Sequence, residues 1–587
     1  MKEWTIMFYL AGDNALAPLV VSQIKAIKDA GFQENIDVLV HFDPNELGVP
    51  TRIFDVNRDR KQRLKTRIGD GRDPFVRNLI EDKIPEQKKS RDDKSKSTEE
   101  TPENPDAINA EDALAKFLSF CCDNHQAKHY ILFLVGHGLV VGNDAFLPDD
   151  NPVSAITLKK LGKILNDFTA DAKGQGGAFE LLFLHSCSMS AIEVAYQLKD
   201  TAKYMIASEG PEFIDSYPYR QLLKKVFNTL EEVKEARRQK AEKKGGKPDA
   251  AASNPRIDIS RLVEKLYFLT LHNATDFLLA GYSHDLALCS LDSKKYTGLT
   301  TAIRQLVAQL TEGLKESNDK VGAPATERGK RIKELVLLAH WEAQSYWGES
   351  YTDLFDFCQC LGKRCDSKDL ARLKKACSNV IDQLKPIKSA KRAERFQALV
   401  IHSDNFGSTS QYSHGLSIYF PWSRPVEVLP KRNPCAGTGG GKRYEDEEKE
   451  ILERYAEYAF TIDLGDHPWL NFLKTYFDET KRRLRREEEN EAVKSSQALA
   501  EARASFNPIG VLSGDKPLPS LDKPAPSLDK SAPSIGGACG CASIKNYPTE
   551  SPDDELKRVH GKTVKNAKAF AITEGALGAF NKQIKSK

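Results

Sequence analysis

The sequence predicts an α/β fold with a mostly parallel sheet that helices cover on both faces. In the first half of the chain, short and nearly continuous apolar runs alternate with amphipathic stretches. A strand that is buried on both faces consists of such a run, because neither face meets water. The expected strands are 4–10, 37–42, 51–56, 130–135, 179–184, 203–208 and 286–291. The helices expected between them include 19–30, 108–121, 191–200 and 257–278.

Beyond residue 296 the spacing of apolar residues becomes helical. Apolar side chains recur at i, i+3 and i+4, which is the period of one helix face. The expected helices are 297–316, 327–347 and 368–384, and strand-like runs return at 398–403 and 415–420. The 587 residues also exceed the roughly 250–300 at which a single core stops growing. We therefore expect a core over 1–295, a mainly helical region over 296–480 and a tail over 481–587.

Three polar segments are expected to lie outside the packed parts. Residues 84–106 are charged, contain proline and have almost no apolar side chains, which is typical of a disordered loop. Residues 231–255 begin as a basic helix extension and end in Gly, Pro and Ala, as an exposed linker does. The tail carries a seven-residue repeat, KPLPSLD, KPAPSLD and KSAPSIG, over 516–536. Its prolines favour an extended, disordered linker that is free to recruit a protein partner.

Charge and cysteine content exclude several classes of partner and compartment. The chain has 86 basic and 83 acidic side chains, so a net charge of +3 gives no argument for nucleic acid or an anionic membrane. The apolar run at 4–10 is too short for a membrane span and lacks a signal cleavage site. Eleven cysteines without a secretory signal favour reduced thiols. We therefore expect a cytoplasmic protein that binds neither nucleic acid nor membrane.

Two expected strands run directly into reactive side chains. The strand at 130–135 is followed by GHG, with His137 at its centre, and the strand at 179–184 is followed by HSC, which ends at Cys187. The carboxyl ends of neighbouring parallel strands meet at one edge of a sheet, where sites assemble. We therefore expect His137 and Cys187 to lie at the same edge.

This pair has the chemistry of a nucleophile and its base. A thiol attacks a carbonyl only as thiolate, and a nearby imidazole takes its proton or holds it in an ion pair. The amides of Gly138 and Cys187 are the expected donors of an oxyanion hole. A lone cysteine at a strand end is more often a small buried hydrophobe, and a histidine beside glycine is often a turn residue. Spacing alone therefore leaves a structural role open for both.

Several ordered segments resemble the clostripain family of cysteine peptidases, in the legumain–caspase clan. WTIMFYLAGDNAL resembles its first strand and turn, CSMSAIEVAYQLKD the helix after the nucleophile, and YMIASEGPEF with YPYRQLL the Ser-Glu strand and the next helix. YTDLFDFC, GLSIYFPW and WLNFLKTYF extend the resemblance to about residue 480, insertions excepted. The resemblance implies a caspase-like fold and a cysteine endopeptidase acting on proteins or peptides, with His137 and Cys187 as the catalytic pair.

The sequence departs from the family pattern beside the nucleophile. Two residues before it the family typically has Asp, in an acidic S1 pocket for Arg or Lys, whereas this chain has His185. The second acidic residue of the family pocket corresponds to Asp215, with Glu212 as the alternative. We expect His185 and Asp215 to line S1, and an imidazole there weakens binding of a basic P1 side chain. The alternative is that His185 never meets substrate.

The resemblance also implies self-cleavage and leaves room for calcium. Exposed basic sites for self-cleavage are expected at Lys159-Lys160, Lys173, Arg237-Arg238 and Lys243-Lys244. Calcium affects some members of the family, but this sequence has no calcium-loop signature, so we predict no metal and no cofactor.

Other constellations support weaker hypotheses. Ser413-His414-Gly415 resembles a caspase Ser-His-Gly signature but precedes its strand, so a structural role is expected. Cys358, Cys360, Cys365 and Cys377 follow a helical pattern, which favours buried cysteines over a zinc site. Two alternative functions remain: a catalytically silent caspase-like scaffold, motivated by His185, and a metal-binding module built on these cysteines.

Overall fold

The computed structural model describes residues 1–480 with twelve gaps. The gaps are 15, 32, 44–51, 57–75, 78–107, 139–143, 151–152, 244–256, 274–282, 319–323, 347–349 and 426–443. The loop expected at 84–106, the end of the linker expected at 231–255 and the tail from 481 lie outside the described residues. The described residues belong to one compact unit, and the boundary expected at 295 stays a prediction.

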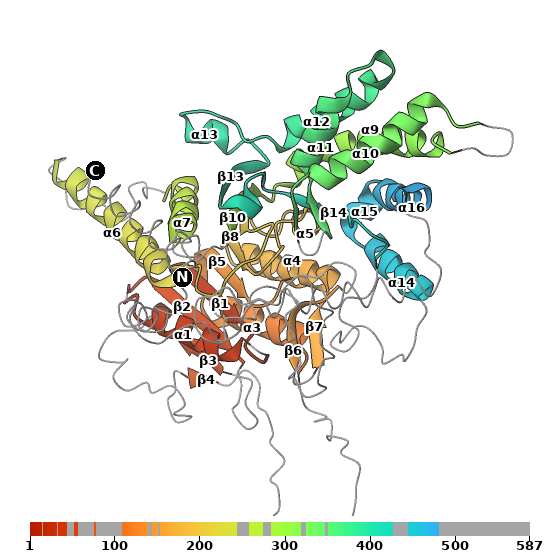
Figure 1. Ribbon diagram of the computed structural model, residues 1–587. Helices are drawn as coiled ribbons and strands as arrows, with labels where there is room; N and C mark the ends of the chain where they lie inside the picture. Colours follow the sequence, from red (N-terminus) through yellow and green to blue (C-terminus); the bar gives the residue numbers. More distant parts are fainter. Residues whose placement is uncertain are drawn as a thin grey trace, which may run out of the picture. The chain divides into compact units, whose positions relative to one another are not determined.

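Among the described residues, nine strands form one sheet, in the order β13-β10-β9-β8-β5-β1-β2-β3-β4 (Figure 1). The five central strands, from β9 to β2, run parallel, and the pairs beyond them on both sides are antiparallel. This arrangement confirms the expected mostly parallel sheet. The strands are β1 (Lys2–Leu10), β2 (Ile36–Phe42), β3 (Arg52–Asp55), β4 (Val76–Arg77), β5 (Ala127–Val135), β8 (Ala178–His185), β9 (Tyr204–Ala207), β10 (His284–Ser290) and β13 (Val400–Phe406).

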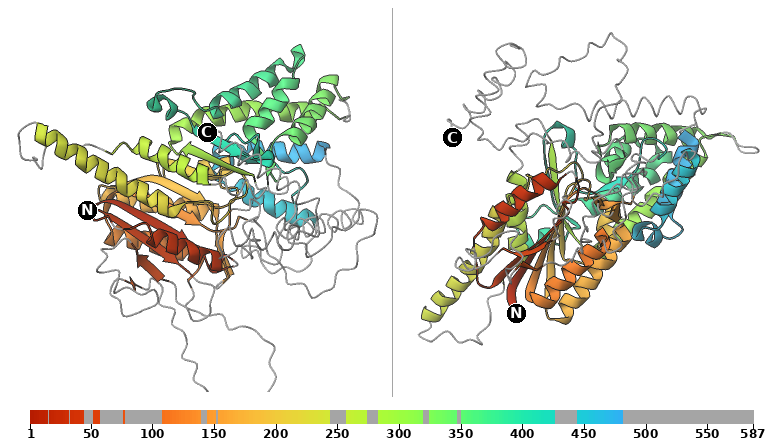
Figure 2. Two further views of the ribbon diagram at one scale, coloured as in Figure 1. Left: turned by 60° about the vertical axis from the view of Figure 1, so that its left-hand side comes forward. Right: turned by 90° about the horizontal axis from the view of Figure 1, so that it is seen from below.

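Helices cover both faces of this sheet (Figure 2). Alternate side chains of β1 enter different cores: Ile6 and Phe8 lie in one apolar cluster, and Met7 and Tyr9 in the other. The first cluster includes side chains of α1 (Ala17–Lys28), α6 (Tyr219–Lys243) and α7 (Ile259–Asn273). The second includes side chains of α3 (Ala110–Asn124) and α4 (Leu158–Gly174). Burial on both faces explains why the strands are continuously apolar.

The region after β10 is mainly helical and shares the core of α3 and α4. Its strand β13 completes the edge of the main sheet. The helices are α9 (Tyr296–Lys315), α10 (Glu327–Glu342), α11 (Leu354–Arg364), α12 (Ala371–Leu384), α13 (Arg392–Arg395), α14 (Tyr444–Ala456), α15 (Ala459–Asp463) and α16 (Pro468–Thr480). No helix among the described residues combines the length and apolar character that a membrane span needs.

Two small sheets lie near the carboxyl ends of the parallel strands: the first contacts the loops after β1 and β5, and the second contacts the loop after β8. The first is the hairpin of β6 (Phe146–Asp150) and β7 (Val153–Ile156). The other joins β11 (Ser345–Tyr346), β12 (Tyr351–Asp353) and β14 (Ser417–Tyr419). The strand expected at 415–420 therefore belongs to a separate sheet. It touches the segment after Cys187, because the Ser417 amide donates to the Ser190 carbonyl (3.0 Å) just before α5 (Ile192–Gln197).

Candidate active site

The sheet register brings His137 and Cys187 to the same edge. β5 and β8 are adjacent and parallel, and Val135 at the end of β5 pairs with His185 at the end of β8. The register continues one step further, because the Gly136 amide donates to the His185 carbonyl over 3.3 Å. Both candidate residues come two positions after these paired strand ends. The structure therefore places them on neighbouring loops, as the sequence predicted.

Gly138 lies directly against the backbone of Cys187. A Cβ atom added at position 138 would lie 1.8 Å from the Cys187 carbonyl oxygen and 2.9 Å from its amide nitrogen. No side chain fits into that space, so glycine is required for this approach. The two segments that carry the proposed oxyanion-hole amides are therefore in van der Waals contact.

The sulfur of Cys187 is covered by the segment that follows β9. Cys187 is only 1% exposed, and the amide of Glu212 donates to its Sγ over 3.2 Å. The thiol in turn faces the Glu212 carbonyl oxygen at 3.6 Å. Ser188, the next residue, adopts a left-handed backbone with φ of 57°, and its amide donates to the Gly210 carbonyl over 3.0 Å. The chain thus turns sharply at the nucleophile and packs beneath residues 210–212.

His185 lies beside Cys187, with its ring fixed and uncharged. Its imidazole stacks on Tyr217 with the ring centroids 3.8 Å apart, and Nε2 lies 2.7 Å from the Phe213 carbonyl. Nδ1 bonds to the hydroxyl of Tyr219 over 2.5 Å. Burial lowers the pKa of His185 to about 4, so the ring is neutral at physiological pH. It therefore contributes no charge to the site.

Asp215 and Glu212, the two candidates for the acidic residue of the S1 pocket, lie in different surroundings. The Asp215 carboxylate accepts a hydrogen bond from Gln23 on α1, and burial raises its pKa. The Glu212 carboxyl lies deeper and accepts a hydrogen bond from Ser216 over 2.9 Å, and burial raises its pKa well above the usual range. The Ser216 hydroxyl also lies 3.3 Å from His185 Nε2. The Ser216 hydroxyl thus connects the Glu212 carboxyl to His185 by hydrogen bonds, whereas Asp215 is hydrogen-bonded to Gln23 on α1.

Sequence reasoning missed His284, which lies beside Glu212. Its Nδ1 is 3.8 Å from the Glu212 carboxyl, and burial lowers its pKa to about 4. His284 is the first residue of β10, which runs antiparallel to β9. A strand of opposite direction brings its first residue to the edge where its neighbour ends. Only the direction of β10 could have identified His284 as a residue of this site, and the sequence does not reveal that direction.

A comparison with known protein families shows which family this chain belongs to. The model of the clostripain family matches residues 8–434. The chain belongs to the clostripain family. Clostripain from Hathewaya histolytica is 23% identical over 461 residues, which cover 72% of this chain and 75% of that protein. The chain is therefore a cysteine peptidase, and its substrates are proteins or peptides.

Solved structures give a weaker likeness. A secreted C11 cysteine protease from Bacteroides thetaiotaomicron, in complex with an irreversible peptide inhibitor, is 14% identical and has a TM-score of 0.42. The match covers 78% of this chain and 100% of that one. An inactive zymogen C11 protease from Parabacteroides distasonis is 15% identical with a TM-score of 0.40, over 79% of this chain and 99% of that one. The family assignment rests on the sequence match.

In this clostripain-family fold, His414, from the Ser-His-Gly segment before β14, lies in different surroundings from His137. Its ring stacks on Phe355 at 4.1 Å, and Nδ1 lies 3.5 Å from the Asp353 carboxylate. Burial opposes protonation, but Asp353 outweighs it and raises the pKa of His414. These contacts link the loop before β14 to β12, and they favour a structural role for His414.

Potential metal ligands lie away from the catalytic pair. Within the described residues, Asp37, Asp55 and His125 are the one group whose potential ligand atoms all lie within 4.8 Å of one another. They sit near the start of β2, the end of antiparallel β3 and before β5, at the edge opposite to Cys187. Lys2 and His125 already contact the Asp37 carboxylate at 3.4 and 2.9 Å. The expectation of no metal and no cofactor stays a prediction, with calcium left open by the family resemblance alone.

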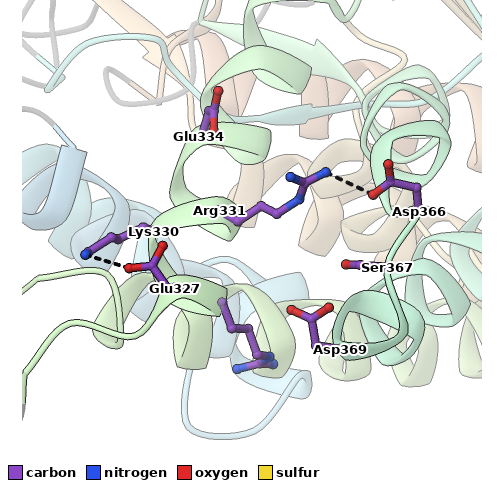
Figure 3. A pocket seen from close by; sticks show the side chains of 8 residues that line it. Glu327, Lys330, Arg331, Glu334, Asp366, Ser367 and Asp369 are labelled. Atoms are coloured by element: carbon purple, nitrogen blue, oxygen red, sulfur yellow. Dashed lines mark hydrogen bonds and ion pairs between the residues drawn. The ribbon is translucent and has the colours of Figure 1, made fainter.

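A surface pocket of about 680 Å³ lies between α10 and the 3₁₀ helix η2 (Lys368–Leu370) (Figure 3). Arg331 on α10 pairs with Asp366 across it, and Lys330 pairs with Glu327 along α10, each at 2.9 Å. None of the predicted site residues lines it. Its acidic and basic groups neutralise one another, so it offers no chemistry for peptide hydrolysis.

Proposed function

We propose that this protein is a cysteine endopeptidase in which Cys187 attacks the scissile carbonyl and His137 shuttles the proton. The observation that carries the proposal is the direct contact of the loop of His137 with the backbone of Cys187, through Gly138. Attack forms a bond from sulfur to the carbonyl carbon, and the amides of Gly138 and Cys187 stabilise the oxyanion. The protonated imidazole then gives its proton to the leaving amine. Water hydrolyses the thioester that remains and regenerates the thiol.

Substrate access requires a movement next to the nucleophile. Cys187 is nearly inaccessible, and both the amide and the carbonyl of Glu212 contact its sulfur. A peptide reaches the sulfur only when the backbone at 211–213 shifts. This burial also supports the second candidate function, a catalytically silent caspase-like scaffold that never opens.

We propose that a basic P1 side chain is accepted but bound weakly. The neutral imidazole of His185 supplies no counter-charge, and burial raises the pKa of Glu212, which disfavours the charged form of that carboxyl. Asp215 faces α1 through its bond with Gln23. An ammonium or guanidinium that enters this region therefore loses water and gains little charge stabilisation from His185 or Glu212 in return, which is unfavourable.

Self-processing is part of the same proposal, and the helices limit where it occurs. Lys159, Lys160 and Lys173 lie on α4, and Arg237-Arg238 lie on α6. A peptidase binds its substrate extended, so cleavage within a helix requires local unwinding. Lys243 ends α6, and Lys244 lies outside the described residues. We favour the bond between them as the processing site.

One experiment tests catalysis and processing together. Wild type, Cys187→Ala and His137→Ala are purified under reducing conditions, analysed by intact mass, and incubated with a peptide library that varies P1. We expect wild type alone to cleave peptides and to show a processed mass. Wild type that stays intact and cleaves no peptide, while Cys187 also resists iodoacetamide, would favour the silent scaffold.

We also propose a cytoplasmic setting, because a thiolate nucleophile has to stay reduced. A tail that recruits a protein partner belongs to the same proposal, since its proline-rich repeat stays exposed when extended. Fractionation of cells that express the full chain, and pull-down with and without residues 481–587, test these two points. Recovery of the protein only outside the cytoplasm would contradict the first.

A further inference from the structure

Asp285 is a buried carboxylate at the catalytic edge with no role in the reaction described above. It is the second residue of β10, which runs antiparallel to β9. The first residues of β10 therefore lie at the edge where β8 and β9 end. Asp285 is only 2% exposed, and a buried charge persists only when hydrogen bonds hold it.

Within the described residues, this carboxylate accepts three hydrogen bonds, and all of them come from the turn at 208–210. Oδ2 accepts from the Glu209 amide over 2.7 Å, and Oδ1 accepts from the Gly210 amide over 3.0 Å and the Ser208 hydroxyl over 3.2 Å. A Cβ atom at position 210 would lie 2.8 Å from Oδ1, so a side chain there would collide with the carboxylate. Carboxylate acceptors form stronger bonds with amides than neutral acceptors do.

The same turn also holds the chain directly after Cys187. The Gly210 carbonyl accepts from the amide of Ser188 over 3.0 Å, and the Ser208 carbonyl accepts from the amide of Ser190 over 2.8 Å. Two residues after the turn, the Glu212 amide donates to Cys187 Sγ. The orientation of Cys187 thus depends on the position of residues 208–212, and that position depends on Asp285.

We propose that Asp285 is a positioning residue of the peptidase: through the backbone at 208–212 it sets the direction in which Cys187 presents its sulfur. The inference rests on the proposed catalytic role of Cys187. Asp285 touches neither substrate nor the reacting atoms, so its removal affects the reaction step and leaves peptide binding nearly unchanged. Small displacements of reacting groups cost about a hundredfold in rate.

The sharpest variant is Asp285→Asn in the full-length chain. Asn keeps the shape but has one acceptor oxygen, and its NH₂ group faces an amide that also donates. We expect kcat to fall about 10- to 100-fold with KM within about threefold of wild type. The rate at which iodoacetamide alkylates Cys187, followed by mass, is expected to change in parallel.

Glu193→Gln is the matched control for loss of a buried carboxylate. Glu193, on α5, is fully buried and accepts from the Tyr419 amide (2.9 Å) and the Tyr455 hydroxyl (2.7 Å), and neither of these bonds involves the turn at 208–210. We expect this variant to lower the melting temperature while kcat stays within about threefold of wild type. Equal losses of kcat in both variants at equal melting temperatures would overturn the positioning role, as would an Asp285→Asn enzyme with the kcat of wild type.

A milder variant covers the case in which Asp285→Asn fails to fold. Ser208→Ala removes one of the three donors, and a fall in kcat of about two- to fivefold at unchanged KM is expected from one lost hydrogen bond. An unchanged kcat would then overturn the proposal. If wild type cleaves no peptide, the peptidase proposal fails on its own. The alkylation rates of Cys187 then decide the positioning role separately, and equal rates in wild type and variant refute it.

Discussion

At the scale of single residues, the proposed P1 preference depends on His185, two positions before the proposed nucleophile. His185 and Cys187 both belong to the side of β8 that carries α1, α6 and α7, because alternate residues of a strand share a face. The aromatic neighbours Tyr217 and Tyr219 hold the imidazole in one orientation. His185 is therefore a rigid neutral group at the position where, in the proposed S1 pocket, an acid would attract a basic P1 side chain.

His185→Asp is expected to increase cleavage after Lys and Arg. An aspartate at this position can accept hydrogen bonds from Tyr219 and Ser216, which stabilise its ionised form. The new charge is expected to raise kcat/KM for basic P1 about tenfold or more relative to an uncharged P1, which corresponds to about 1.4 kcal/mol. The measurement is a P1-varied peptide set on the purified enzyme. His185→Asn is the uncharged control, and an equal gain in both variants would contradict the electrostatic explanation.

At the scale of elements, α16 attaches the helical region to the small sheet beside the site. Trp469 on α16 is fully buried, and its indole Nε1 donates to the Tyr419 carbonyl of β14 over 3.0 Å. β14 in turn contacts the segment after Cys187 through Ser417. Packing of α16 thus supports the strand that borders the nucleophile loop.

Trp469→Ala is expected to destabilise the fold by about 3–5 kcal/mol, because it removes a large buried side chain and leaves a cavity. Urea unfolding followed by circular dichroism measures the loss. Trp341→Ala is the matched control, since Trp341 on α10 is 73% exposed and is expected to change stability by less than about 1 kcal/mol. Equal unfolding midpoints for the two variants would show that α16 does not carry this stability.

At the scale of the whole molecule, buried histidines make stability depend on pH. His41 in β2 is fully buried and stacks on Tyr9 with the centroids 4.5 Å apart, and within the described residues neither ring nitrogen has a hydrogen-bond partner. Burial lowers its pKa to about 3. Below pH 6.5 the unfolded chain binds a proton at this position and the folded chain does not, so the folded state loses stability as the pH falls.

His41→Phe removes this difference. The free energy of unfolding of wild type is expected to fall relative to the variant by about 1.4 kcal/mol for each pH unit between pH 6.5 and about pH 3. At pH 7.5 the two proteins differ only by the packing of the new ring against Tyr9 and Phe117. Urea unfolding at several pH values tests this. Curves that stay parallel down to pH 4.5 would show that His41 does not contribute to acid sensitivity.

Sequence by itself determined the central sheet, its covering helices and the positions of the candidate nucleophile and base. Strands buried on both faces are continuous apolar runs, and strand direction in a parallel sheet fixes which ends meet. β11 and β12 have two and three residues and pair across a short turn, whereas β14 pairs with β12 from a distant part of the chain. That pairing was therefore absent from the local pattern.

Only the tertiary structure decided which side chains surround Cys187. The antiparallel direction of β10 brings His284 and Asp285 to the catalytic edge, and the path of the loop after β9 places Glu212 over the sulfur while Asp215 turns to α1. Strand direction and loop path depend on contacts between segments far apart in the chain. The residues proposed to carry out the reaction were identified from the local sequence pattern, whereas those proposed to position them became apparent only from the tertiary packing.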